Sequence, residues 1–324
     1  MGVMRQKKTH CFHKIYEQIN AVPGVSIYEI ANNTGISRNT VTKYLTEMYE
    51  DTILVGPQIR VLPAPDYKEY VYLMNFRDPY HFYRNLNGFP HVLYHCMTFG
   101  DWNAMVITDR LIDFSQLKGY EKTVFQGVRY RSYTPKTDYI LWGKSFEKFF
   151  ERIAKFSSRG EHKNRTLAPV LDWGKDQWKM YYAFKDTTRK TATTTLKKIG
   201  VRYEEYVKWM EDIDIHCTFL TGFYLGGYQT YSTYCFLFST DYEQTVKDLF
   251  SCFPTTPFIM EVGNQLMVFV SVVLSGIKRR FFCCIFDMKT QGIIKTFNHA
   301  AVIFQTSQQS INLSSSPFSR WKYR

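Results

Sequence analysis

A short polar segment near the start of the chain carries side chains suited to the edges of DNA bases. Ala31, Gly35 and Val41 have the spacing of a helix-turn-helix, with a small residue at the helix crossing, a glycine in the turn and an inward-pointing aliphatic residue. The next helix, predicted at residues 37–48, carries hydrogen-bonding groups and two cations on its outward side. Such groups fit base edges and phosphates in a major groove, so we predict contact with duplex DNA. A helix that contacts only proteins is the alternative. The predicted contact residues are Ser37, Arg38, Asn39, Thr40, Thr42 and Lys43.

Three helices and a hairpin are predicted to position this surface. Apolar residues at helical spacing give a first helix that ends at residues 22–24. Ser26 and Glu29 form a capping box for the second helix, which ends at Gly35, and Ser37 caps the third. Residues 52–55 and 58–62 are predicted to form a hairpin on which Arg60 is a candidate phosphate contact. Residues 1–62 are therefore predicted to be a winged helix-turn-helix.

A second module is predicted after a stiff Pro-Ala-Pro linker. Within residues 66–134, strands are expected at 69–76, 91–98, 103–108 and 125–133. Helices are expected at 79–86 and from about 115. This β-α-β-β-α-β order is typical of a ferredoxin-like domain.

The chain repeats this organisation at an offset of 165 residues. The shift places Gly35 on Gly200, and residues 14–16 (Lys-Ile-Tyr) on 179–181 (Lys-Met-Tyr). We predict an α+β fold with two copies, the second comprising a degenerate winged helix-turn-helix at 172–225 and a ferredoxin-like domain at 229–305. Glu204 and Glu205 lie on its third helix, where carboxylates would repel phosphates. Residues 306–324 are predicted to be a disordered tail.

Positive charge is concentrated in the middle of the chain. The formal net charge is +12, and residues 144–198 contain fourteen Lys and Arg against six Asp and Glu. A polyanionic partner is expected, and a merely solvated face is the alternative. In the connector at 135–171, an amphipathic helix is predicted to place its basic residues on one stripe. Its candidate phosphate contacts are Lys148, Arg152 and Lys155.

Several other chemistries lack the residues that they require. The seven cysteines contain no Cys-x-x-Cys, which favours reduced thiols in a cytosol. His10, Cys11 and His13 have metal-ligand side chains but no second ligand cluster, so no metal and no cofactor are predicted. The longest apolar run, residues 266–274, is too short for a bilayer, and the first residues lack a signal-peptide pattern. We predict a cytoplasmic protein that does not contact membranes.

The combination of modules resembles the leucine-responsive regulatory (Lrp/AsnC) family of transcription regulators. Residues 98–103 (Thr-Phe-Gly-Asp-Trp-Asn) resemble the Thr-Gly-x-x-Asp turn of that family, with one extra residue and an asparagine in place of the acid. The resemblance implies a small, amino acid-like effector bound at Gly100, Asp101 and Asn103; a turn without a ligand is the alternative. It also implies that the two copies pair as an intrachain pseudo-dimer, which could associate further as a homodimer, in a prokaryotic host.

An enzyme is the other hypothesis, because siroheme decarboxylases are similar in their two-module architecture. Removing a tetrapyrrole carboxyl group requires cationic anchors and a proton donor, commonly histidine. His91 and His95 are four residues apart on a predicted strand, with Arg84 nearby in sequence. The dense Arg and His pattern expected of those enzymes is missing. We therefore predict a regulator that binds double-stranded DNA, without catalytic residues and not an enzyme.

Overall fold

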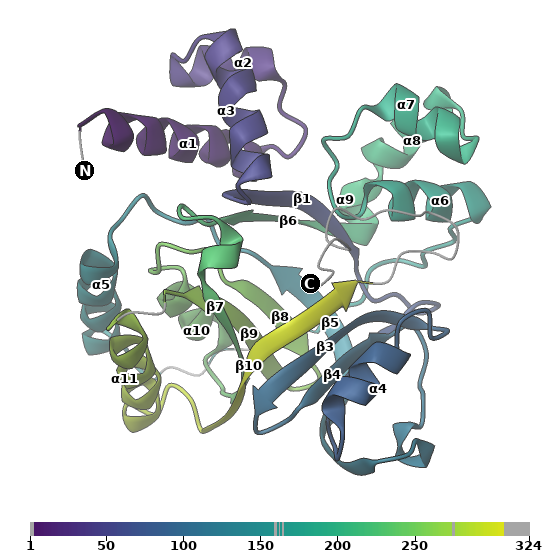
Figure 1. The fold of residues 1–324 in the computed structure, drawn as a ribbon, viewed down its shortest axis with the longest axis vertical. Coiled ribbons are helices and arrows are strands. Elements are labelled where there is room, and N and C mark those ends of the chain that lie inside the picture. Colours follow the sequence, from purple (N-terminus) through teal and green to yellow (C-terminus); the bar gives the residue numbers. More distant parts are fainter. Residues whose placement is uncertain (1–2, 159–160, 162, 164, 274–275, 308–324) are drawn as a thin grey trace.

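The computed structural model describes residues 3–158, 161, 163, 165–273 and 276–307. The predicted tail at 306–324 lies outside the described residues beyond Ser307. The described chain contains both groups of helices and groups of strands, which confirms a mixed α and β fold (Figure 1).

The first head of the molecule consists of the helices α1 (Val3–Ala21), α2 (Ile27–Thr34) and α3 (Arg38–Glu50). The hydroxyl of Ser26 accepts the N–H of Glu29, whose carboxylate accepts the N–H of Ser26, so the predicted capping box forms. Gly35 ends α2 at φ +69°, and its N–H donates to the carbonyl of Ala31. The local signals therefore predicted this head.

The predicted hairpin at 52–55 and 58–62 is wrong. Both segments belong largely to one strand, β1 (Leu54–Val61), which is irregular between Val55 and Gln58. This strand pairs antiparallel with β6 (Cys217–Phe223), so its partner comes from the second half of the chain. The backbones approach closely, because a Cβ on Gly56 would lie 2.5 Å from the carbonyl oxygen of Leu220.

The second head repeats this order with α6 (Lys175–Phe184), α7 (Ala192–Ile199), α8 (Tyr203–Glu211) and α9 (Ile213–His216). Gly200 ends α7 at φ +66°, as Gly35 ends α2. The paired strands β1 and β6 pack against both heads. Phe223 of β6 lies in the core of the first head, and Ile59 of β1 lies in the core of the second. Figure 1 shows the two heads side by side above the remaining strands.

Those strands form one closed barrel. The first half contains β2 (Glu69–Phe76), α4 (Pro79–Asn85), β3 (Val92–Gly100), β4 (Ala104–Thr108), the 3-10 turn η1 (Phe114–Gln116) and β5 (Tyr120–Tyr133). The second contains β7 (Ser232–Ser239) after the 3-10 turn η2 (Tyr228–Thr230), then α10 (Glu243–Phe250), β8 (Phe258–Val262), β9 (Gln265–Val272), α11 (Ile277–Thr290) and β10 (Thr296–Ser307). The order β10-β3-β4-β2-β5-β8-β9-β7 closes through β10 and β7.

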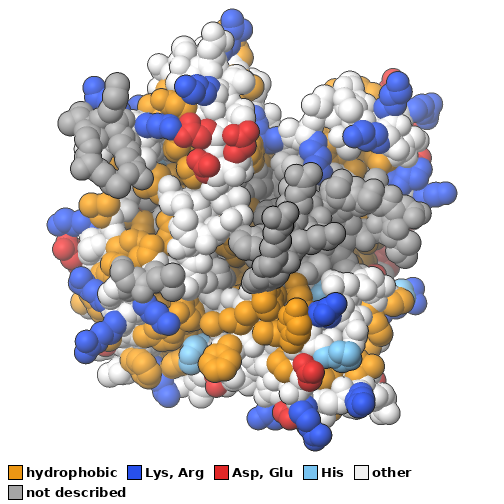
Figure 2. Space-filling view, in the orientation of Figure 1, with side chains coloured by type: hydrophobic (Ala, Val, Ile, Leu, Met, Phe, Trp, Pro, Cys, Tyr) orange, Lys and Arg blue, Asp and Glu red, His pale blue; other side chains and the backbone are white. Residues whose placement is uncertain are grey.

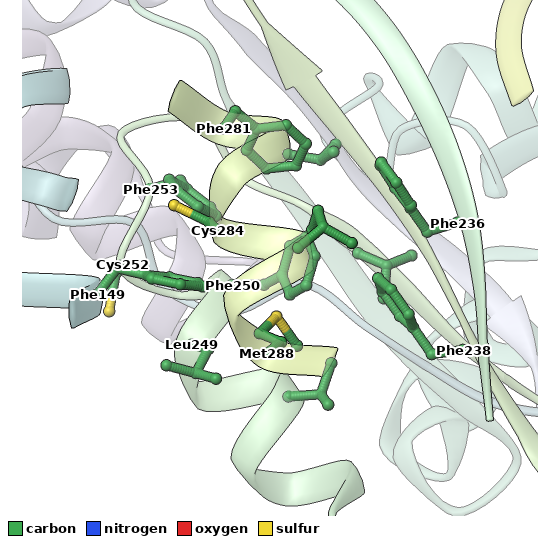
Figure 3. Packing of buried hydrophobic residues seen from close by; sticks show 14 of the residues in the cluster. Phe149, Phe236, Phe238, Leu249, Phe250, Cys252, Phe253, Phe281, Cys284 and Met288 are labelled. Atoms are coloured by element: carbon green, nitrogen blue, oxygen red, sulfur yellow. The ribbon is translucent and has the colours of Figure 1, made fainter. Parts of the chain in front are cut away.

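The two halves of the barrel are covered differently. Helices α10 and α11, with α5 (Trp142–Ala154) from the connector, bury the large phenylalanine-rich cluster of Figure 3 against the second half. On the first half, α4 buries a smaller cluster that includes Phe76 and Phe82. The helix predicted from about residue 115 is only a 3-10 turn. Eleven residues join β4 to β5, too few for the helical crossover that usually links parallel strands.

Candidate functional site

The predicted DNA-contacting side chains lie together on one face of α3. Val41, Leu45 and Met48 are buried against the first head, so the opposite side of the helix faces solvent. The hydroxyl of Ser37 accepts the N–H of Thr40 at 3.3 Å and caps the helix. Thr40 is half-buried, and the other five predicted residues are exposed: Ser37, Arg38, Asn39, Thr42 and Lys43.

Arg60 does not belong to this surface. Its Nη1 donates to the carbonyl oxygens of Ile59 at 2.8 Å and Lys185 at 3.0 Å, and its Nη2 donates to Gln58. These contacts fasten β1 to the second head. Nη1 of Arg60 is thus committed to backbone carbonyls within the protein, and a phosphate contact by Arg60 stays a prediction.

Two of the three candidate phosphate contacts on α5 already have partners within the protein. Lys148 pairs with Asp138, and Arg152 donates to the carbonyl of Asp248 and to Ser251. Lys155 is exposed. Figure 1 shows α5 beside α11, on the barrel. The stripe therefore helps to attach the connector to the second half of the barrel.

The turn predicted to bind an effector is held by neighbouring strands. A Cβ on Gly100 would lie 2.4 Å from the carbonyl oxygen of His299, so β10 requires a glycine here. The carboxylate of Asp101 accepts the N–H of His299 at 2.7 Å. The amide of Asn103 bonds both backbone groups of Phe76, at 2.9 and 2.8 Å. An effector at this turn stays a prediction, and it would have to replace these contacts.

The two histidines expected on one strand face have different environments. His91 precedes β3 with φ +64°, and its ring contacts Asp109 at 2.9 Å on the surface. His95 lies within β3 and is only 1% exposed. Neither ring nitrogen of His95 forms a hydrogen bond of good geometry with a described residue, although a weak interaction with the backbone of Tyr83 favours the protonated ring. Burial lowers the pKa of His95 to about 4, opposed by the backbone of Tyr83, so the ring is neutral at pH 7.

Helix α4 and strand β10 complete the surroundings of His95. The ring of Tyr83 lies 4.9 Å from the imidazole, centroid to centroid, and its hydroxyl is 2.6 Å from that of Thr306. Burial raises the pKa of Tyr83, so the phenol keeps its proton. The neighbouring Arg84 is exposed, with its guanidinium 5.9 Å from the ring of Tyr80. We call Tyr83, Arg84, His95 and Thr306 the His95 site.

This site brings together a neutral proton acceptor and a hydroxyl donor, and the exposed cation of Arg84 follows Tyr83 on α4, against the ring of Tyr80. Sequence analysis singled out Arg84 and His95 but missed Tyr83 and Thr306. The helix carrying Tyr83 was predicted, whereas Thr306 is 211 residues beyond His95 in the sequence and reaches it through the pairing of β10 with β3. No local pattern gives that pairing.

Comparisons with known proteins concern the fold. No protein-family model matches the chain, and no curated protein matches it significantly. The structure is similar to the crystal structure of the siroheme decarboxylase NirDL, with a TM-score of 0.51, 11% identity and 96% of both chains covered. A second structure of NirDL, in complex with an iron-uroporphyrin III analogue, has a TM-score of 0.39 and 10% identity over 91% of this chain and 90% of the other.

The likeness to NirDL corrects the prediction that the chain is not an enzyme. That prediction assigned the two-module architecture to a regulator, yet the fold extends over nearly the full length of an enzyme. The resemblance to the Lrp/AsnC family accordingly concerns architecture. Among the described residues, no helix has the length and apolar character needed to cross a membrane.

Proposed function

We propose that this chain is an enzyme that decarboxylates a side chain of a tetrapyrrole, as a siroheme decarboxylase does, with His95 handling the proton. The observation that carries the proposal is the buried imidazole without a hydrogen bond of good geometry to a described residue. Leaving a buried polar group unpaired costs about 1–3 kcal/mol, and such groups often mark functional sites. The fold shared with NirDL supports the same class of reaction.

The reaction suits the groups at the His95 site. Loss of CO2 from a side-chain carboxylate leaves a carbon that must take up one proton. A bound carboxylate would raise the pKa of His95, because a nearby negative charge favours the imidazolium. His95 would thus gain a proton with the substrate and deliver it to carbon, assisted by the Tyr83 hydroxyl. Arg84 would anchor a carboxylate, and Tyr83 must move because its ring covers the imidazole.

Activity on siroheme tests this proposal. Purified chain is incubated anaerobically with siroheme, and products are measured by mass spectrometry for loss of CO2. We expect turnover by the wild type and a loss of at least about 100-fold in His95→Leu, because general acid–base groups contribute about 10²–10⁴-fold. The exposed His91→Leu is the matched control and keeps its activity. The proposal fails if siroheme is unchanged or if His95→Leu remains fully active.

A second candidate function, sequence-specific binding of double-stranded DNA in transcription regulation, is supported by the exposed face of α3. Figure 2 shows Lys and Arg side chains on both heads, in agreement with the positive net charge. The repeated element order and the matching turns at Gly35 and Gly200 support the finer assignment of two helix-turn-helix heads, which share the β1–β6 pair in place of separate wings, and two ferredoxin-like halves that pair as a pseudo-dimer. Selection of genomic fragments by the purified chain tests this function.

A further inference from the structure

A cavity of about 480 Å3, widely open to solvent, lies between the two heads. The turn between α1 and α2, residues 22–26, forms one wall. Thr188, Arg189 and the α8 residue Met210 from the second head form the opposite wall, and Phe219 of β6 also lines the cavity. Small-molecule sites often have this size and often lie where two domains meet. None of the residues of the His95 site lines this interhead cavity.

Arg189 is the polar centre of the interhead cavity. Its Nη1 donates to the carbonyl oxygens of Val25 at 2.8 Å and Pro23 at 3.3 Å, which links the second head to the first. Within the described chain, its Nη2 and Nε form no hydrogen bond. A guanidinium offers five donors in a planar fork, and a carboxylate accepts two of them side by side. Nη2 and Nε of Arg189 therefore remain available to donate to a planar anion such as a carboxylate.

Other lining groups fit the rest of such a ligand. Thr188 also lines the cavity, but its hydroxyl oxygen is buried away from solvent, so Arg189 is the polar group that a ligand would meet. Met210, Ile213 and Phe219 supply apolar surface. Asp214 also lines the cavity, and its negative charge disfavours ligands with more than the one anionic group that Arg189 can pair. The lining thus favours one carboxylate on an apolar body.

We infer that the interhead cavity binds a small organic monocarboxylate. Its carboxylate contacts Nη2 and Nε of Arg189, while its apolar part packs against Met210 and Phe219. Because the cavity has walls from both heads, the bound ligand holds the heads at their present separation. This site goes beyond the proposed decarboxylation and does not depend on His95.

Phenylacetate is a suitable probe, with phenylacetamide as its uncharged counterpart. Calorimetric titration of the full chain is expected to show saturable binding of phenylacetate and at least about tenfold weaker binding of the amide, because charged hydrogen bonds are stronger than neutral ones. Arg189→Gln is expected to weaken binding about 10- to 100-fold. The control Arg202→Gln, on an arginine whose side chain is 80% exposed on the same head, leaves binding unchanged.

A second variant separates ligand contact from head attachment. Met210→Trp fills the cavity and keeps both bonds from Arg189 to the first head, so loss of phenylacetate binding there supports a ligand site in the cavity. The inference is overturned if the wild type does not bind phenylacetate, if the amide binds equally well, or if either Arg189→Gln or Met210→Trp binds like the wild type. Activity on siroheme is measured separately, so failure of one proposal leaves the other standing.

Discussion

The two halves of the barrel have the same order of strands and differ in how much covers them. The second half lies under α5, α10 and α11, whose side chains make one continuous apolar cluster. The first half lies under α4 and the turn η1, and a cavity of about 450 Å3 opens beside Tyr72 and Phe114. His95 is on this thinner side. The more heavily covered half thus stabilises the barrel, while the other can hold polar groups that weaken packing.

Removing a phenylalanine from each half tests that division directly. Phe253→Ala empties a fully buried position among Phe149, Phe250 and Phe281, and we expect a loss of about 4–5 kcal/mol in the free energy of unfolding. Phe82→Ala is expected to cost about 3 kcal/mol, because Phe82 lies at the edge of a smaller cluster and is 8% exposed. Urea denaturation measures both. Equal losses would contradict the division into a stabilising and a functional half.

Signals within a few residues predicted the helix ends and a mixed α and β fold, and contacts across the halves were beyond them. Ser26, Gly35 and Gly200 act on their own helix ends, so sequence spacing was sufficient. The partner of β1 is β6, and no turn or alternation in β1 indicates a strand about 160 residues away. The same limit applies to Arg60, because the carbonyl that it contacts belongs to Lys185. Thr306, which completes the His95 site, was missed for this reason.

Acid should weaken the first half of the barrel through His95. Its pKa is lowered from 6.5 to about 4 in the folded chain, so the unfolded chain binds more protons between these values. Stability is full above pH 6.5, decreases as the pH falls, and is lowered by about 2 kcal/mol at pH 5. His95→Leu removes this component, so its unfolding free energy should depend less on pH. Urea titrations at pH 7 and pH 5 on both proteins measure the difference, and identical pH dependence would contradict the assigned burial.

The two heads can be compared in the same way, by how much each contributes to the salt dependence of DNA binding. We expect the effects of these substitutions to be smaller than those above. Arg38 and Lys43 lie on the exposed face of α3, whereas Lys208 of α8 shares its helix with Glu204 and Glu205. For a duplex recovered by selection, Arg38→Ala and Lys43→Ala should each reduce the slope of log affinity against log salt by about 1, as expected when one phosphate contact is lost. Lys208→Ala should leave the slope unchanged, because the adjacent carboxylates repel phosphates. Fluorescence anisotropy over a salt series measures these slopes, and equal changes in both heads would show that the second head also contacts DNA.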